Sequence, residues 1–237
     1  MAARIRTFLQ TYFYFVMSIV IAVAVTYGFC QTIDKNLIHA ASPRPGVLYL
    51  HAVIFSTWLV FYIVQSGLVR MRHVLLHRTL GWFGAALGGA IVILGVSTAI
   101  TMGRYHHRHD HWTLMQSQIG VPLFDITCFA IALTLAIVWH RRPEFHRRLI
   151  LLASCILAGA GLARFPFARH LRYHSFEYLA IDFLVLLGVV RDLIVDRRVH
   201  KVYAYGLPAF VLGSVLLIVS LVSRLPIVMR FMQFVLG

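Results

Sequence analysis

Charged residues are scarce in this chain, and acidic ones are scarcer still. Of its 237 residues only 13% are charged, with 8 Asp and Glu against 22 Lys and Arg, whereas 60% are hydrophobic. A soluble domain of this length has to cover its core with polar side chains, and this composition supplies too few of them. The sequence therefore excludes an ordinary water-soluble protein and predicts that the lipid bilayer is the solvent.

Cysteine and the common catalytic motifs are also lacking. The three cysteines, Cys30, Cys128 and Cys155, share no C-x-x-C spacing, which excludes a zinc knuckle and a disulfide framework. The sequence contains neither H-E-x-x-H nor G-x-S-x-G. A membrane-embedded metal-dependent hydrolase or a transporter is therefore the least favoured functional class.

Long apolar runs dominate what is present. Seven of them can be placed, at about 8–29, 47–69, 79–102, 113–139, 149–168, 176–195 and 205–224. Each is close to the roughly 20 residues that a helix needs to cross the hydrocarbon core. The first run follows Arg4 and Arg6 like a signal peptide, but it is long enough to span and lacks a small-x-small cleavage site. The predicted fold class is all-α, a polytopic transmembrane helical bundle of about seven spans.

The distribution of Lys and Arg predicts the orientation. On alternate sides of the seven spans, 13 and 9 of these 22 residues gather, and the richer side is expected to be cytoplasmic. This places the N-terminus inside and the C-terminus outside a bacterial cytoplasmic membrane. Anionic lipid explains the net charge of +14, so we expect no nucleic-acid partner. Short loops predict one domain over 1–237, with 225–237 as an interfacial tail.

Polar residues inside the spans are the best functional signal, because hydrocarbon tolerates them poorly. His51, Trp58, Gln65 and Arg72 recur at seven-residue intervals on one face of the second span. Such a stripe suits either a site or interhelical hydrogen bonding. In the fourth span, Gln118 and Asp125 repeat the same interval, with Asp125 expected near the midplane. We expect Asp125 to face a polar partner from the second, third or sixth span, with Gln65 and Asp182 as candidates.

The densest chemistry lies between residues 164 and 182. If the chain is helical after Pro166, then His170, His174 and Glu177 share one face and could ligate a metal. Arg164 is placed in depth to neutralise Glu177 or Asp182. We therefore expect His51, Arg164, His174, Glu177 and Asp182 to converge at one level of the outer leaflet. The alternative is an interfacial histidine pair beside lipid phosphates.

A histidine tract, "GRYHHRHDHW", occupies the third loop on the predicted outer side. Its candidate metal ligands are His106, His107, His109 and His111. Histidines in such a tract can hold copper, zinc or haem iron. They are equally compatible with a solvated loop that responds to pH.

Two segments carry a family resemblance. The stretch "LHAVIFSTWLVFYIVQSGLVRMRHVLLHRTLGWFGAALG" (50–88) resembles a large group of uncharacterised bacterial membrane proteins in which a span that starts with His ends in an HR-x-LG turn. The stretch "EFHRRLILLASCILAGAGLARFPF" (144–167) is similar to the HRRL signature of the same group. Together they cover about a quarter of the chain. The resemblance implies a helical membrane fold and little chemistry.

More distantly, the HR-x-LG turn resembles that of small cytochromes b, and HRRL resembles a membrane protein family involved in terminal oxidase assembly. By that analogy His51, His77 and His146 are the positions expected to bind a cofactor such as haem b. The leading hypothesis is a membrane protein with a metal or haem site that serves redox chemistry or the assembly of a respiratory complex. The alternative is an accessory subunit that packs against helices, lipid or pigment of a larger complex without catalysis of its own.

Overall fold

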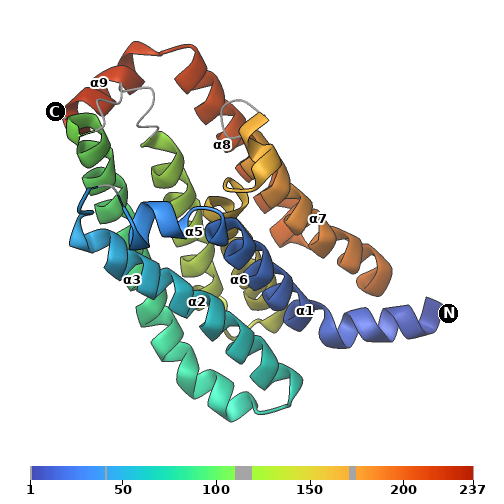
Figure 1. Cartoon of the computed structure of the whole chain (residues 1–237). Helices are drawn as coiled ribbons and strands as arrows, with labels where there is room; N and C mark the ends of the chain where they lie inside the picture. Colours follow the sequence, from blue (N-terminus) through green and yellow to red (C-terminus); the bar gives the residue numbers. More distant parts are fainter. Residues whose placement is uncertain (1, 41, 110–118, 171–174, 237) are drawn as a thin grey trace.

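The computed structural model describes residues 2–40, 42–109, 119–170 and 175–236, and helices make up nearly all of them. No strand occurs in these ranges (Figure 1). The α-helices are α1 (Ala2–Cys30), α2 (Gly46–Arg70), α3 (Val74–His109), α5 (Gly120–Val138), α6 (Pro143–Leu162), α7 (Ser175–Asp196), α8 (Lys201–Val222) and α9 (Pro226–Leu236). Two short helices are the π-helix η1 (Asp34–Ile38) and the 3₁₀ helix η2 (Pro166–His170). The predicted all-α class is confirmed.

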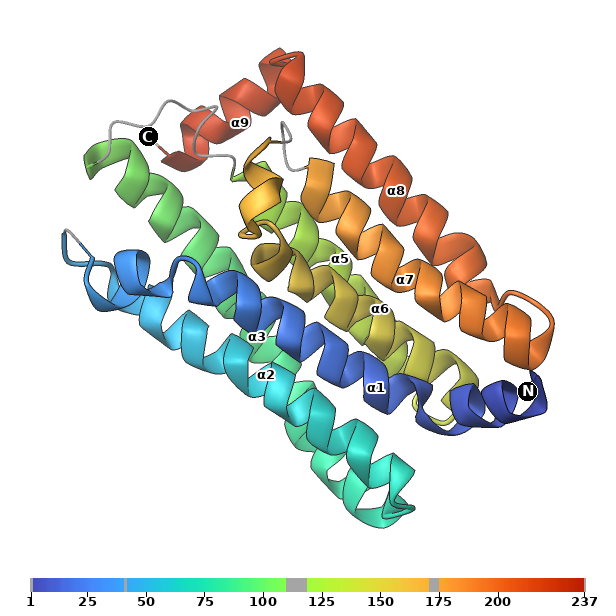
Figure 2. The same ribbon diagram turned by 45° about the vertical axis from the view of Figure 1, so that its right-hand side comes forward.

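The helices have the length and composition of membrane spans. Six of them, α1, α2, α3, α5, α6 and α8, are long and apolar enough to cross a bilayer. The one remaining expected span, the sixth, is α7, a helix of 22 residues whose charged side chains keep it outside this apolar class. It nevertheless packs beside α6, α1 and α8 in the same bundle (Figure 2). The chain is thus a multi-pass membrane protein.

Helix α6 is the centre of the bundle. It packs against α1, α5, α7 and α8, and most of its residues are buried, Leu151 and Cys155 completely. The α2–α3 hairpin stands on one side of α6, and α7 and α8 stand on the other (Figure 2). Because α6 contacts helices on both sides, residues along it can join distant parts of the chain.

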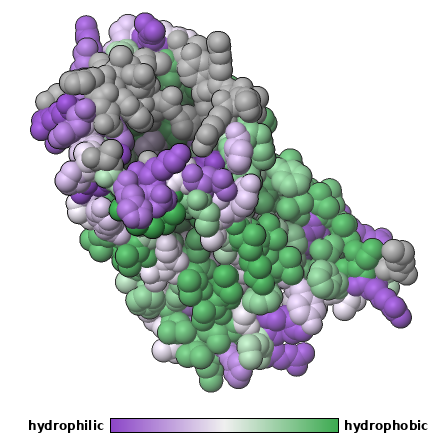
Figure 3. Space-filling model, viewed as in Figure 1, coloured by the Kyte–Doolittle hydropathy of each residue, from purple (hydrophilic) through white to green (hydrophobic). Residues whose placement is uncertain are grey.

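The outer surface of the bundle is apolar. Leu75 and Trp82 are 81% and 75% exposed, which would be costly in water and is favourable against lipid tails. Figure 3 shows hydrophobic side chains over the flank of the bundle and hydrophilic ones gathered toward its ends. This pattern matches a protein whose flank faces hydrocarbon and whose ends face headgroups and water.

The helix ends fall at two levels. One level holds the N-terminus and the turns at 71–73, 139–142 and 197–200, and the other holds 31–40, 42–45, 163–170 and 223–225. Following the distribution of Lys and Arg, we call the first level the inner end and the second level the outer end. The two ends carry different polar clusters.

Several helix boundaries differ from the predicted ones. Helix α3 runs to His109 instead of ending at 102, so His106, His107 and His109 are helical and not part of a loop. The reason is tertiary packing, since Tyr105 is buried and Gly103 lies against Leu236. The span expected at 113–139 is described only from Gly120 onward.

The fifth span and the segment after it also differ from prediction. Helix α6 covers Pro143–Leu162 instead of 149–168, because Pro143 starts the helix at a position where its missing N–H costs nothing. Residues Pro166–His170 then form a 3₁₀ helix, and α7 begins at Ser175. One α-helix carrying both His170 and Glu177, as the spacing argument required, is therefore not formed.

The C-terminal tail forms the predicted helix. Helix α9 crosses the outer end from α8 back to α3 (Figure 1). Its Met232 and Leu236 are buried, whereas Phe234 is exposed. The guanidinium Nε of Arg104 donates to the Val235 carbonyl at 2.8 Å, which fixes α9 against the end of α3.

Gly28 of α1 and Gly161 of α6 set the distance between these two helices. A Cβ on Gly161 would lie 2.7 Å from the Val25 Cα, whereas a Cβ on Gly89 of α3 would meet no atom within 4 Å. We expect Gly161→Ala to lower the free energy of unfolding by about 1–3 kcal/mol or more, because backbone has to move. Gly89→Ala is the matched control and should be neutral or slightly stabilising. Thermal unfolding in mild detergent measures both, and equal stability of the two variants would contradict the close packing.

Candidate functional site

Two histidines from different helices face each other at the inner end. The rings of His77, near the start of α3, and His146, in the first turn of α6, have centroids 6.3 Å apart and planes 80° apart. Both side chains are partly buried. These are two of the three positions that the cytochrome analogy named as cofactor ligands.

The ring of His146 is held in one orientation. Its Nδ1 lies 2.9 Å from the Ala136 carbonyl oxygen of α5. A carbonyl only accepts hydrogen bonds, so Nδ1 carries the proton and donates it. In the neutral ring this leaves Nε2 with its lone pair, which is how metal-binding histidines are usually arranged.

The position of His77 depends on the α2–α3 turn. Arg72 ends that turn in the left-handed conformation, with φ 63°, and the Gln65 side chain donates to the His77 carbonyl at 3.3 Å. The His77 Nδ1 is buried and has no hydrogen-bond partner in the described part of the chain. A buried nitrogen without a partner costs about 1–3 kcal/mol. One turn further, a Cβ on Gly81 would meet no atom within 4 Å, so the helix face beside His77 is open.

The third proposed cofactor ligand, His51, lies elsewhere. It sits in the second turn of α2 at the outer end, where its ring stacks on Phe55 with centroids 3.9 Å apart. Nineteen residues of α2 separate it from the inner end at Arg70, about 28 Å at the rise of an α-helix. His51 therefore cannot share a cofactor with His77 and His146.

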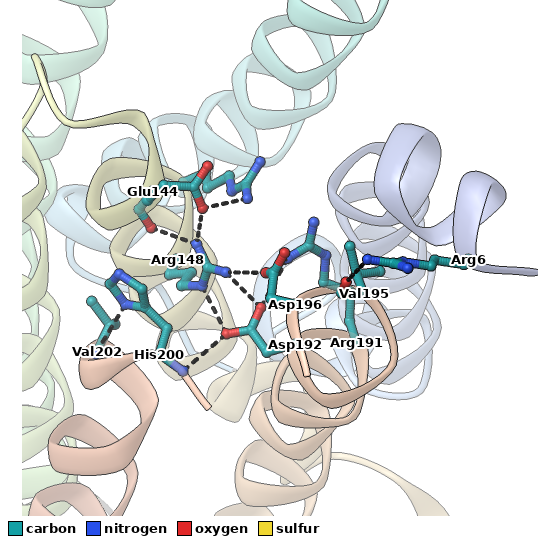
Figure 4. Close-up of polar contacts among 10 residues, drawn as sticks. Arg6, Glu144, Arg148, Arg191, Asp192, Val195, Asp196, His200 and Val202 are labelled. Carbon is teal, nitrogen blue, oxygen red and sulfur yellow. Dashed lines mark hydrogen bonds and ion pairs between the residues drawn. The ribbon is translucent and has the colours of Figure 1, made fainter. Parts of the chain in front are cut away.

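A buried ion network lies beside the histidine pair, and Arg148 of α6 is its centre (Figure 4). Its Nε and Nη2 donate to the two carboxylate oxygens of Asp192 of α7 at 2.8 and 2.7 Å. Its Nη1 donates to the Glu144 side chain at 2.5 Å, and Nη2 also reaches Asp196 at 2.9 Å. Arg148 is 1% exposed and Asp192 is 0% exposed. Every part of this guanidinium is thus bonded within the protein.

Arg191 of α7 completes the network. Its Nη1 donates to Asp192 at 2.9 Å and to Asp196 at 2.6 Å. Arg147 pairs with Glu144 at 2.5 Å, so three arginines balance three carboxylates. Balanced and bidentate pairing is what allows charges to be buried without a prohibitive desolvation cost.

The sequence did not predict this network. Arg147, Arg148 and Arg191 were counted there among the loop charges of the cytoplasmic side. Two signals could have revealed it. Arg191 and Asp192 stand next to each other inside the apolar stretch "VLLGVVRDLIVD", and Glu144 lies one helical turn before Arg148. Charges of opposite sign inside apolar stretches predict pairing across helices.

His200 joins the network to α8. Its backbone N–H donates to Asp192 at 3.3 Å, and its ring Nδ1 accepts from the Val202 N–H at 3.2 Å as the N-cap of α8. Burial, followed by the nearby positive charge of Arg148, lowers the pKa of His200. The neutral ring is therefore the form that caps the helix.

At the outer end, Asp125 of α5 meets Glu177 of α7. Their side chains lie close to each other, and Tyr178 lies close to Asp125. Arg164, after the end of α6, lies within electrostatic range of both Glu177 and His51. The acid that lies near Asp125 is Glu177, at the start of the sixth expected span, and not one of the two candidates that were named, Gln65 and Asp182.

The depth expected for Asp125 requires a correction. Instead of lying at the middle of its span, it is five residues from the first residue of α5, which ends at Val138. Gln65 is occupied at the inner end by the His77 carbonyl. Asp182 has a buried carboxyl oxygen, Oδ1, that lacks a partner among the described residues.

The predicted metal site receives no support from the described residues. No three His, Cys, Asp or Glu side chains gather there in a way that could hold a metal ion. His109 instead stacks on Tyr105 with centroids 4.4 Å apart, and His106 contacts the edge of the same ring. Other parts of that prediction lie outside the described residues, namely His111, His174 and the side chain of His170, as does Gln118 of the polar stripe expected on the fourth span.

Comparison of the chain with models of known protein families, with curated proteins and with solved structures finds no match. Function therefore has to be argued from the histidine pair, the ion network and the carboxyl pair.

Removing Arg148 should be far more costly than removing its neighbour. We expect Arg148→Ala to lower the free energy of unfolding by about 3–5 kcal/mol, because Asp192 would stay buried without its main partner. Arg147→Ala, which breaks a more exposed pair with Glu144, should cost about 0–1 kcal/mol. Thermal and denaturant unfolding in mild detergent compare the two. Similar losses would show that burial of the network contributes little.

Acid should weaken the α7–α8 junction through His200. A lowered pKa means that the unfolded chain takes up the proton first as pH falls below the ordinary histidine value, about 6.5. The contribution of His200 to the free energy of unfolding is therefore complete above the ordinary histidine pKa. It is lost as the pH falls through the lower pKa of the folded state. His200→Ala should cost about 0.5–2 kcal/mol at neutral pH and reduce the loss of stability on acidification. His200→Asn, which can still cap, should restore stability but not the pH dependence, as melting temperatures across pH would show.

Proposed function

We propose that this chain is a haem-binding protein of the bacterial cytoplasmic membrane, in which His77 and His146 would hold a b-type haem near the inner face. The observation that carries the proposal is the geometry of the pair, with centroids 6.3 Å apart. The resemblance of the HR-x-LG turn to small cytochromes b agrees with it. The role that follows is one-electron transfer, within or toward a respiratory-type complex.

The distance fits two imidazoles on one iron. A metal–imidazole bond is about 2 Å long, so two imidazoles that held one iron would have ring centroids about 6 Å apart. The orientation of His146 agrees, because its Nδ1 is committed to the Ala136 carbonyl. His77 adds a buried ring nitrogen that has no partner within the described ranges. Both residues therefore suit ligation better than they suit a closed hydrophobic contact.

The number of ligands favours haem over a bare metal ion. Protein zinc sites use three or four side chains, and this end of the bundle brings two histidines together. Two histidines would be enough to hold a haem, which would supply one-electron chemistry when bound. Arg78 and Arg142, next to the histidine-bearing turns and exposed, provide positive charge suited to propionate groups.

The chain's own residues would tune the site through position and charge. The Ala136 carbonyl makes the His146 ring a stronger donor to a metal. Gln65, by bonding to the His77 carbonyl, holds the start of α3 beside α2 and so fixes the height of His77. Partial burial of both rings limits access of water.

An optical spectrum tests the proposal directly. The protein is expressed in a haem-producing host and purified in mild detergent, and its reduced-minus-oxidised spectrum and haem content are measured. We expect haem in the wild type and at least about tenfold less in His77→Ala and in His146→Ala. His140→Ala is the matched control, since His140 lies at the same end and bonds to the Ile137 carbonyl at 2.8 Å but is exposed and unpaired with His77. His51→Ala should also keep its haem.

A colourless wild-type preparation that is folded and free of metal would overturn the proposal. Stoichiometric co-purification of such a preparation with a larger membrane assembly would then support the accessory-subunit function. Haem that survives loss of both His77 and His146 would place the ligands elsewhere.

A further inference from the structure

The ion network at the inner end leaves part of one buried arginine unused. Both bonds of Arg191 to carboxylates leave from Nη1, at 2.9 Å to Asp192 and 2.6 Å to Asp196. Its Nε is buried and has no hydrogen-bond partner in the described part of the chain. In Arg148, by contrast, the edge formed by Nε and Nη2 holds a carboxylate at two points. The corresponding edge of Arg191 thus has a buried donor that lacks an acceptor.

Tyr14 of α1 lies where further unused donors meet. The guanidinium carbons of Arg147 and Arg191 are 5.2 and 5.7 Å from the centre of the Tyr14 ring, so both side chains converge on this ring. Arg147 donates from Nη2 to Glu144 at 2.5 Å, but its Nε is buried without a partner among the described residues, and so is the Tyr14 hydroxyl. Helices α1, α6 and α7 therefore each place around one ring a donor that needs an acceptor.

A stripe of polar side chains on α1 leads from this point to the surface. Arg6, Gln10 and Tyr14 follow one another at intervals of four residues, so they lie on the same side of the helix. Arg6 donates from Nη2 to the Val195 carbonyl of α7 at 2.8 Å (Figure 4), one helical turn beyond Arg191. Arg6 and Gln10 are exposed. The seam between α1 and α7 is thus lined by donors from its buried part to its surface.

The positive charge at this seam is not balanced within it. The network pairs three arginines with three carboxylates, and Arg6 adds a fourth arginine beside it. Two more arginines, Arg197 and Arg198, follow Asp196 at the end of α7 and are exposed. A water molecule could accept from the unused donors but would leave the excess positive charge in place. An anion would supply both the acceptors and the charge, and arginine side chains suit phosphate in particular.

The surroundings favour a lipid as the source of the phosphate. The seam lies at the inner end, at the level where the headgroups of the cytoplasmic leaflet lie and where anionic lipids are found. Exposed apolar side chains border it on both helices, namely Phe8 of α1 and Val190 and Leu193 of α7. Such surfaces suit acyl chains, which a free phosphate ion lacks.

We propose that the seam between α1 and α7 is a binding site for the phosphate group of an anionic phospholipid of the inner leaflet. The buried Nε groups of Arg147 and Arg191 and the Tyr14 hydroxyl donate to the phosphate oxygens. Arg6 supplies positive charge at the entrance, and the acyl chains lie against the bordering apolar side chains. The bound lipid ties the N-terminal part of α1 to α7 and adds to the single bond between Arg6 and Val195. The site does not depend on the proposed haem.

Binding of a fluorescent phosphatidylglycerol to the full chain in mild detergent tests the site. We expect the wild type to bind it at least about tenfold more tightly than phosphatidylcholine with the same chains and label, which carries no net charge. Arg6→Gln and Arg147→Gln should each weaken binding of phosphatidylglycerol about tenfold, because each removes a charged donor. Tyr14→Phe, which keeps the ring, should weaken it about threefold. Arg141→Gln is the matched control, because Arg141 is exposed at the same end in the turn at 139–142.

Equal affinity of the wild type for the two lipids would overturn the proposal. Equal losses in Arg6→Gln and Arg141→Gln would also overturn it, because they would show only a general attraction between surface charges. Displacement of the lipid by millimolar inorganic phosphate would overturn the assignment to a lipid, whereas no displacement supports it.

The variants leave the buried pair of Arg148 and Asp192 intact, so they should fold. If Arg147→Gln does not fold, Arg6→Gln changes an exposed residue and still tests the site, as does Tyr14→Phe. Haem content is measured in the same samples and should be unaffected by Arg6→Gln, which separates this site from the proposed haem site.

Discussion

The bidentate pair between Arg148 and Asp192 is the interaction on which the rest of the bundle depends. Helix α7 carries too many charged side chains for its apolar residues alone to place it in a bilayer. Arg148 of α6 neutralises it from the centre of the bundle, with bonds of 2.7 and 2.8 Å to one carboxylate. Without this pairing, Asp192 would be a buried charge in lipid, which hydrocarbon does not tolerate. Helix α7, and with it Glu177, is in the bundle because this charge is balanced.

Helix α6 connects the three polar clusters along its length. His146, a member of the histidine pair, and Arg148, the centre of the ion network, lie in its first two turns. Gly159 lies near the other end, where it makes room for Glu177, and Arg164 follows the last turn. One buried helix therefore sets the positions of groups at both ends. The small residues along it permit this, because they let neighbouring helices approach closely.

The polar stripe on the second span shows what a seven-residue interval can predict and what it cannot. Trp58 and Gln65 are buried as the seven-residue interval predicted, and the indole of Trp58 donates to Ser154 of α6 at 3.3 Å. Arg72, by contrast, lies beyond the end of α2 in a turn. The interval correctly identified the inward face but could not tell where the helix ends. Helix ends depend on caps and turns that a periodic pattern does not contain.

The sequence by itself determined the membrane class, the all-helical fold and the approximate spans, because bilayer thickness and apolar run length are local properties that the chain order records directly. It also singled out Asp125, Glu177, His77 and His146 as polar residues of interest, but it did not single out Arg148 and Asp192. Only the tertiary structure decided how they pair. The partners lie far apart in the sequence, as Arg148 and Asp192 do at 44 residues. Their pairing follows from which helices pack together and at what height, and side-chain volume and charge balance across the whole bundle set that arrangement.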